Sequence, residues 1–483
     1  MREIKLMING QDVAARSGAT FERHNPISGA AVTRAAAATA EDAVAVADAA
    51  AATFPAWAAM APTARRGLLR AAAAKLREMG QEFAETISAE TGATLGWGHF
   101  NVYFASSLLE EAASMTTQIT GEVIPTDQPG TLAMGIRQPA GVCLGMAPWN
   151  APVILGVRAV AMPLACGNTV ILKASESCPA THWLIGEVFR RAEFPAGVVN
   201  VITHSAEGAP AIAEALIGHK AVRRVNFTGS TRVGRIVAEM AGRNLKPVLL
   251  ELGGKAPMLV LDDADLDEAA AAANFGAFMH QGQICMSTER IIVDDKIADE
   301  FLAKFKAKAG ALTLGDPAAG QFALGAVVDK STVTRLNMLI DDAQAKGAKI
   351  LTGGKCDSVL FPPTIVDRVE KGMKLYSEES FGPVVAVIRA KSLDNAVALA
   401  NDSDYGLSAA VFGRDTGRAL AVARRIDSGI CHVNSPTVQD EGQMPFGGVK
   451  ASGYGRFGGH AAIAEFTELR WISMTSQPRH YPI

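Results

Sequence analysis

The stretch GVCLGMAP, residues 141–148, decides the fold of this chain, because it is a short apolar run bounded by glycine and proline. A helical stretch from about 152 to 165 follows it, and a second apolar run, NTVILKAS, occupies 168–175. Short β-rich runs that alternate with longer helical segments predict a parallel sheet with right-handed crossovers. We therefore expect an α/β fold.

The same alternation continues along most of the chain. Further strands are expected at VVNVITH (198–204), VRRVNFT (222–228) and PVLLEL (247–252), with helices near 179–192, 206–216 and 230–242. A second series begins at PMLVLDDAD (257–265) and includes helices at 266–281 and near 296–311 and strands at RIIVDD (290–295), VVAVIRA (384–390) and SAAVFGR (408–414). Two consecutive series without an internal repeat predict two α/β units.

Length and composition indicate a large globular protein. A chain of 483 residues, 49% hydrophobic and 20% charged, is long enough for about two to four structural units. A net charge of −3 offers no basic surface for nucleic acid. No apolar run reaches the roughly 18 residues of a membrane helix, because Arg158 interrupts the best candidate at 151–166. The MREIK start lacks the apolar core of a secretory signal, so we expect a cytoplasmic protein without a membrane partner.

The cysteines do not form a recognisable framework. There are six, they are widely spaced, and none belongs to a C-x-x-C pair, so neither a disulfide scaffold nor a zinc site is supported and no metal is expected. His280 lies shortly before Cys285, which leaves a Cys–His hydrolase as a weak alternative.

Two segments carry reactive side chains. FMHQGQICMS (278–287) contains Cys285, and LLELGGKAP (249–257) contains Glu251. A thiol can attack an electrophilic carbon, and a carboxylate can activate the water that later releases the product. An isolated cysteine is usually a small buried hydrophobe, but the pairing of these segments favours covalent catalysis.

Two glycine patterns are candidates for binding phosphate. Gly229-Ser230-Thr-Arg-Val-Gly234 follows a strand and opens a helix, where free backbone N–H groups and the helix dipole favour a pyrophosphate. A plain strand–helix turn with Ser230 as N-cap is an equal alternative. GYGRFG at 453–458 has no clear strand before it and no βαβ unit after it, so we reject it as a dinucleotide fingerprint.

Further blocks allow the chain to be compared with a known family. They are PWN (148–150), KASE (173–176), FTGSTRVG (227–234), LELGGK (250–255), GQIC (282–285), ESFGP (379–383) and PFGGVKASGYGR (445–456). In this order, and from about residue 5 to 475, the chain resembles the NAD(P)-dependent aldehyde dehydrogenase superfamily. Within it, the chain is most similar to bacterial enzymes that oxidise aromatic aldehydes, such as benzaldehyde, vanillin and salicylaldehyde.

The resemblance implies three domains. A Rossmann-like parallel-sheet domain that binds NAD would comprise 1–120 and 141–252, and an α/β catalytic domain would comprise 253–445. A small β bridging domain would consist of 121–140 and 446–483. By resemblance, the extended TLAMGIRQP stretch would add to the sheet of a neighbouring subunit and give a homodimer or a dimer of dimers.

The resemblance also implies roles for individual residues. Cys285 would attack the aldehyde, Asn150 with the Cys285 backbone N–H would stabilise the resulting oxyanion, and Glu251 would activate water to release a carboxylic acid. Around the cofactor, the implied residues are Pro148, Trp149, Lys173, Glu176, Gly229, Ser230, Gly234, Glu379 and Phe381. Lys173 and Glu176 would hold the adenosine ribose. An acid there repels a 2′-phosphate, so NAD is expected, with NADP possible but disfavoured.

Trp97, Phe100 and Phe104 lie at i, i+3 and i+7 on one helix face, which a core stripe would explain equally well. By resemblance they line a substrate pocket together with Ala151, Leu155, Arg158, Met279, Ile284, Met286 and Phe446. An aromatic wall beside a small alanine suits a planar ring. Arg158 would bind a phenolic oxygen or a semialdehyde carboxylate, unless it forms a structural ion pair.

We therefore expect a dehydrogenase for a hydroxylated benzaldehyde such as salicylaldehyde. An enzyme for aliphatic aldehydes or for a semialdehyde such as succinic semialdehyde is the alternative. An acylating enzyme that passes the thioester to coenzyme A is disfavoured, because such relatives commonly lack the glutamate at the position of Glu251. A catalytically silent structural relative is the alternative from another class.

Overall fold

The chain folds around two large sheets and a small projecting one. The computed structural model describes all residues from 1 to 483. The first sheet has the order β22-β12-β11-β8-β9-β10-β2-β3. Its strands are β22 (Gly453–Tyr454), β12 (Val248–Glu251), β11 (Val222–Thr228), β8 (Val142–Met146), β9 (Thr169–Lys173), β10 (Val199–Ile202), β2 (Leu6–Ile8) and β3 (Gln11–Val13).

The five central strands of this sheet, from β12 to β10, are parallel, as the sequence predicts. Helices cover both faces, because consecutive residues of the central strands are apolar and buried. Cys143 belongs to the core beneath α2 (Pro62–Glu78), α3 (Gly80–Thr91), α4 (Leu95–Met115), α5 (Pro152–Ala165) and α6 (Pro179–Arg191). Its neighbours Val142 and Leu144 face α1 (Ala40–Ala59), α7 (Ala209–Gly218) and α8 (Thr231–Arg243).

The second sheet has the order β15-β16-β17-β14-β13-β19-β20 and is parallel except for the edge strand β15. Its strands are β15 (Lys349–Thr352), β16 (Thr364–Asp367), β17 (Val384–Ala390), β14 (Thr288–Asp294), β13 (Ala256–Val260), β19 (Ser408–Phe412) and β20 (Ile430–Val433). Two separate cores lie on its faces. The covering helices are α9 (Leu266–Phe278), α10 (Ala298–Gly310), α11 (Lys330–Ala345), α12 (Lys374–Ser377), α13 (Leu393–Asn401) and α14 (Thr416–Ala423).

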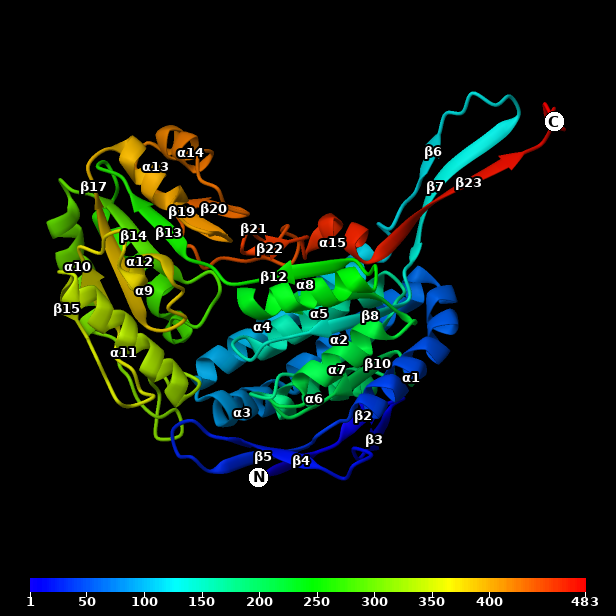
Figure 1. The fold of residues 1–483 in the computed structure, drawn as a ribbon, viewed down its shortest axis with the longest axis horizontal. Helices are drawn as coiled ribbons and strands as arrows, with labels where there is room; N and C mark the ends of the chain where they lie inside the picture. The colour runs from blue at the N-terminus through cyan, green and yellow to red at the C-terminus, as the bar shows by residue number, and fades with distance from the viewer.

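A third sheet projects from this body. It consists of β6 (Glu122–Ile124), β7 (Thr131–Pro139) and β23 (Thr467–Thr475), all antiparallel. Figure 1 shows it as an arm with the C-terminus at its tip and α15 (Gly459–Glu465) at its base. Within the range 446–483, β22 pairs with β12 of the first sheet, whereas β23 belongs to the arm.

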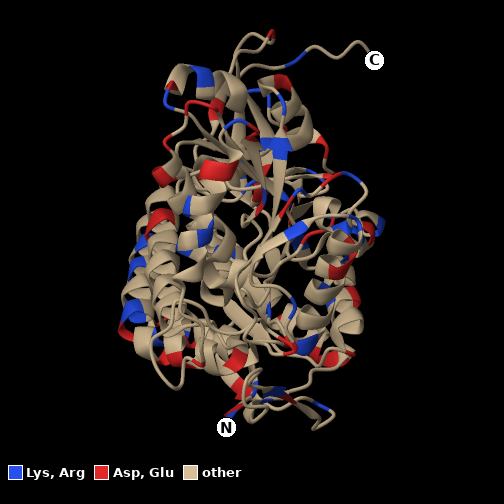
Figure 2. Cartoon of the chain, turned by 90° about the vertical axis from the view of Figure 1, so that its left-hand side faces the viewer, with Lys and Arg blue, Asp and Glu red and all other residues tan.

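Smaller elements complete the fold. β1 (Arg2–Ile4), β5 (Ala31–Ala36) and β4 (Thr20–His24) form a separate sheet, and β18 (Tyr405–Gly406) pairs with β21 (Val449–Lys450). In Figure 2, positions of positively and negatively charged residues are interspersed along the outer helices. None of the helices combines the length and apolar character that a membrane crossing requires.

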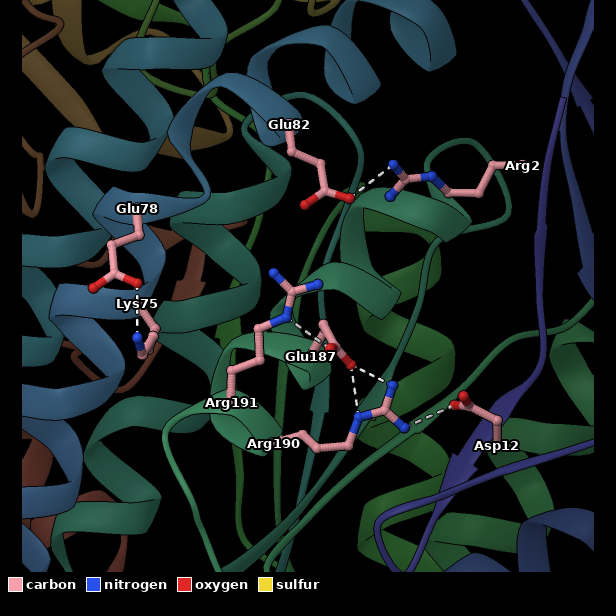
Figure 3. A network of polar contacts seen from close by, with 8 residues as sticks. All are labelled: Arg2, Asp12, Lys75, Glu78, Glu82, Glu187, Arg190 and Arg191. Atoms are coloured by element: carbon pink, nitrogen blue, oxygen red, sulfur yellow. Dashed lines mark hydrogen bonds and ion pairs between the residues drawn. The ribbon is translucent and has the colours of Figure 1, made fainter.

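An ion-pair network fixes α6 to the edge of the first sheet (Figure 3). Glu187 pairs with both Arg190 and Arg191, and Arg190 also reaches Asp12 in β3, at 3.2 Å. Arg190 and Asp12 are about one-third exposed, so this link contributes little stability.

One predicted helix is shorter than expected. The helix predicted over 266–281 ends at Phe278, and His280, Gln281 and Gly282 all have left-handed backbone conformations, with φ of 49°, 55° and 67°. A Cβ on Gly282 would lie 2.3 Å from the Gly382 carbonyl oxygen, so only glycine fits there. This strained turn leads the chain from α9 to Cys285.

Candidate active site

Cys285 lies in the turn between the left-handed segment and β14. Side-chain contacts anchor the segment just before it, because Gln281 Nε2 donates to the Ala326 carbonyl at 2.8 Å and Val328 N donates to Gln283 Oε1 at 2.9 Å. The thiol is partly exposed, toward a cavity. Burial, followed by the charge of Glu251, raises the pKa of Cys285 well above its ordinary range.

Glu251 is the last residue of β12 and is buried. Neither of its carboxylate oxygens has a hydrogen-bond partner. Burial raises the pKa of Glu251 to about 7, although the nearby Cys285 thiol and the Arg158 cation oppose the rise. A carboxylate with this pKa and no fixed partner is suited to accept a proton near neutral pH.

Asn150 faces the same cavity and is held in place at both ends. Its side-chain Nδ2 donates to the Gln283 carbonyl at 2.9 Å, and its own carbonyl accepts from Trp97 Nε1 at 2.9 Å. The amide nitrogen carries two hydrogens, so one remains for another acceptor. The structure therefore brings Cys285 and Asn150 to one cavity wall.

The cavity has a volume of about 380 Å³ and contains every predicted pocket residue. They are Trp97, Phe100, Phe104, Ala151, Leu155, Arg158, Met279, Ile284, Met286 and Phe446. The aromatic rings form a stack, with centroids 5.6 Å apart between Trp97 and Phe100 and 6.0 Å apart between Phe100 and Phe104. The three aromatic positions on α4 therefore line a cavity, and Trp97 and Phe104 also belong to the buried core on this face of the sheet.

Five further residues line the cavity and were missed from the sequence: Ile154, Phe275, Val438, Gln439 and Asp440. Asp440 is the most consequential, because it forms an ion pair with Arg158. The Arg158 guanidinium also lies 4.3 Å from the centroid of Phe446. No local pattern in the sequence signals a pair whose members are 282 positions apart.

His280, the basis of the weak hydrolase alternative, does not pair with Cys285. It is buried and stacks on Trp97 with a centroid distance of 4.5 Å and an interplanar angle of 8°. Neither ring nitrogen has a hydrogen-bond partner, and burial lowers the pKa of His280 to about 3. A neutral ring packed in this way does not serve as the base for a thiol.

No group of three or more His, Cys, Asp or Glu side chains is arranged to hold a metal ion.

The predicted cofactor residues converge at the carboxyl ends of the central strands, where a parallel sheet binds ligands. Lys173 ends β9, and Glu176 follows it. Burial lowers the pKa of Lys173 to about 8, with Glu176 opposing. His204, which sequence analysis missed, follows β10 and contacts Lys173 Nζ through its Nε2 at 2.5 Å. His204 Nδ1 contacts the Ser205 carbonyl at 2.8 Å, which fixes Nε2 as the acceptor.

The predicted phosphate-binding turn joins β11 to α8. Ser230 caps α8 by accepting from Val233 N at 3.4 Å. Gly234 has a packing role, since a Cβ there would lie 2.4 Å from a methyl carbon of Leu252. Gly229 lies at the end of the strand against Phe227. The turn thus satisfies the N-cap interpretation and leaves the first backbone N–H groups of α8 available to a phosphate.

The remaining cofactor residues lie between the two large sheets. Trp149 follows Pro148 and meets Phe381 edge to face, with a centroid distance of 5.8 Å. Glu379 Oε1 accepts from Gly254 N at 2.9 Å, and burial raises the pKa of Glu379 to about 7.

The loop that carries Glu379 and Phe381 is held by a buried ion pair that sequence analysis missed. Lys255 Nζ lies 2.7 Å from Glu289 Oε2. Glu289 also accepts from the backbone N–H groups of Ser380 and Phe381 at 3.0 Å. These contacts fix the loop, in which Phe381 has a φ of 44°.

Comparison with known proteins agrees with this architecture. Residues 13–472 match the aldehyde dehydrogenase family. The chain is 59% identical to a vanillin dehydrogenase of Pseudomonas fluorescens over 100% of both chains, and 50% identical to a salicylaldehyde dehydrogenase of Pseudomonas putida over 99% of both. The crystal structure of a salicylaldehyde dehydrogenase from Pseudomonas putida G7, complexed with salicylaldehyde, superimposes with a TM-score of 0.99 at 48% identity, covering 100% of both chains. This chain belongs to the aldehyde dehydrogenase family.

Proposed function

We propose that the protein catalyses the NAD-dependent oxidation of a hydroxylated benzaldehyde, such as salicylaldehyde, to its carboxylic acid. The observation that carries this proposal is the cavity of about 380 Å³ in which aromatic and aliphatic side chains surround the Cys285 thiol. A flat ring gains dispersion and stacking energy against such a wall, about 0.5–1.5 kcal/mol per aromatic pair beyond area burial. The vanillin and salicylaldehyde dehydrogenases that the chain resembles support the same substrate class.

The reaction follows from the side chains in the cavity. Once its proton has passed to solvent, the Cys285 thiolate bonds to the aldehyde carbon, and the carbonyl oxygen takes the negative charge. The free N–H of Asn150, with the Cys285 backbone N–H, stabilises that oxygen, and loss of one such donor typically costs about 2.7–4 kcal/mol. When bound, the nicotinamide supplies the acceptor for the hydride that leaves this carbon. The thioester that remains is attacked by water from which Glu251 has taken a proton, and the C–S bond breaks to release the acid.

The residues at the strand ends suit a dinucleotide. Lys173 offers a donor and Glu176 an acceptor for ribose hydroxyls, and the α8 N-terminus offers a site for the pyrophosphate. The negative charge of Glu176 disfavours the 2′-phosphate of NADP, so we propose NAD as the cofactor. Glu379 and Phe381 would meet the nicotinamide ribose and ring.

Specific contacts weigh against the alternative functions. Arg158 is already paired with Asp440, so the cavity offers no unpaired cation for the carboxylate of succinic semialdehyde. An acylating enzyme would not need Glu251, which is present and buried near Cys285. A silent structural relative would not need Cys285, Glu251 and Asn150 to meet.

We also propose that the arm joins subunits into a homodimer or a dimer of dimers. Its strands expose large apolar side chains, with Val123 72%, Leu469 66% and Trp471 76% exposed. Such surface is usually covered by a partner, and a monomer by light scattering at micromolar concentration would contradict this.

The domain ranges 1–120 with 141–252, 253–445, and 121–140 with 446–483 stay a prediction. The six free cysteines support a reducing compartment such as the cytoplasm.

A substrate panel tests the proposed function. Values of kcat/KM with NAD should be highest for salicylaldehyde and benzaldehyde and lower for aliphatic aldehydes and succinic semialdehyde. Acid release without coenzyme A separates hydrolysis from acylation. Succinic semialdehyde as the best substrate would refute the aromatic assignment, and the absence of NADH formation with every aldehyde would favour the silent relative.

A further inference from the structure

Arg158 and Asp440 form an ion pair in the wall of the cavity that Cys285 also lines. Both residues are distant from Cys285 in the sequence. Arg158 Nη2 donates to Asp440 Oδ2, and the two side chains are 6% and 12% exposed. The guanidinium lies over the rings of Phe446 and Phe104, at 4.3 and 6.0 Å from their centroids. The pair therefore belongs to the surface against which an aromatic substrate packs.

The hydrogen-bonding capacity of this pair is only partly used. Asp440 Oδ1 is shielded from solvent and accepts no hydrogen bond. Arg158 makes one side-chain hydrogen bond to protein, although its guanidinium has five N–H donors. A buried polar atom without a partner costs free energy, so a ligand group that pairs with it removes that cost.

We propose that Arg158 and Asp440 together form a subsite for a hydroxyl group on the substrate ring. The hydroxyl donates its hydrogen to Asp440 Oδ1 and accepts a hydrogen from the Arg158 guanidinium. Asp440 lines the cavity, but its Oδ1 is shielded, so this contact requires the carboxylate to turn about its Cβ–Cγ bond when the ligand binds. This inference rests on the proposed oxidation of aromatic aldehydes and names the chemical feature that distinguishes the preferred aldehydes.

The subsite discriminates by chemistry as well as by shape. A hydroxyl both donates and accepts, so it satisfies both side chains, whereas a methoxy group only accepts and leaves Asp440 Oδ1 unpaired. A carboxylate has no hydrogen to donate and is repelled by Asp440, whose charge balances that of Arg158. The same pair therefore selects hydroxylated rings and excludes semialdehydes.

The test compares kcat/KM for matched benzaldehydes that carry a hydroxyl or a methoxy group at the 2, 3 or 4 position. The unmodified enzyme should prefer the hydroxyl by about tenfold or more at one position, because a hydrogen bond to a charged group is lost in the methoxy compound. The double variant Arg158→Leu/Asp440→Leu should lose this preference. Replacing both members of a buried pair with apolar side chains avoids leaving one charge unpaired.

A second variant gives a gain of activity that misfolding cannot produce. Asp440→Asn leaves the Arg158 charge uncompensated, so kcat/KM for 4-carboxybenzaldehyde should rise about tenfold relative to benzaldehyde. Glu441→Gln is the matched control, because it removes the same charge from the exposed next residue, which does not line the cavity, and should leave both ratios unchanged.

Three results would overturn the proposal. These are an unmodified enzyme without a hydroxyl preference at any position, a double variant that keeps the preference, or equal effects of Asp440→Asn and Glu441→Gln. Failure of the proposed function looks different, because succinic semialdehyde would then be the best substrate or no aldehyde would give NADH.

Discussion

The two ends of the cavity treat their charged groups in opposite ways. At the reacting end, both oxygens of Glu251 lack a partner, and burial raises its pKa to about 7. At the far wall, Arg158 and Asp440 neutralise each other. A group that gains and loses a proton during turnover benefits from having no fixed partner, whereas charges that recognise substrate must persist. The contrast teaches that pairing separates the residue proposed to react from the two proposed to recognise substrate.

The largest expected effect is at Cys285. Cys285→Ala removes the sulfur that bonds to the aldehyde carbon, so aldehyde oxidation should be abolished. NAD affinity, measured by isothermal titration, should change little because the residues proposed to hold the ribose and phosphates lie at the strand ends of the first sheet. Normal turnover by this variant would refute covalent catalysis by Cys285.

The second-largest loss of activity is expected for Glu251→Gln. Its turnover should fall by about 10²–10⁴-fold, the usual contribution of a general base. Hydride transfer precedes hydrolysis, so a burst of NADH should persist while acid release becomes slow. Loss of the burst together with turnover would give Glu251 an earlier role, such as accepting the Cys285 proton.

The pH dependence of the unmodified enzyme tests the same residue. Glu251 acts as a base only when it is ionised, and burial places its pKa at about 7. The rate of acid release should therefore rise as the pH increases through about 7 and level off above it. In Glu251→Gln this limb should disappear, and an unchanged limb would assign it to another group.

The contrast also explains what the sequence could predict. Cys285, Glu251 and Asn150 lie in short blocks, so recognition of each block located each residue. The parallel strands and α5 were predictable because their apolar periodicity is local. The end of α9 was not, since left-handed His280 and Gln281 are stabilised by tertiary contacts such as Gln281 with Ala326. Asp440 was missed because its partner Arg158 is distant in sequence.

A smaller effect is expected on the aromatic wall. Phe104→Ala should raise KM for benzaldehydes about 10–200-fold, which corresponds to about 1–3 kcal/mol, the range for a modest change in an apolar pocket. KM for short aliphatic aldehydes should rise less. Phe100→Ala is the matched control, because Phe100 is 39% exposed and Phe104 only 8%. Its effect should be smaller, and equal losses for aromatic and aliphatic aldehydes in Phe104→Ala would indicate a structural role alone.

The smallest effect is expected for Trp97→Phe. This variant tests whether the aromatic wall of the cavity helps to position Asn150 at the reacting end. Trp97 belongs to the aromatic wall, yet its Nε1 donates to the Asn150 carbonyl at 2.9 Å. Trp97→Phe keeps an aromatic ring and removes this donor, so Asn150 is less firmly held opposite the developing oxyanion. One neutral hydrogen bond is worth about 0.5–1.5 kcal/mol, which predicts a two- to tenfold fall in the rate of NADH formation in single turnover. KM for benzaldehyde should stay nearly constant because the apolar surface remains. A rise in KM without a change in this rate would show that Trp97 only lines the pocket and that the two ends act independently.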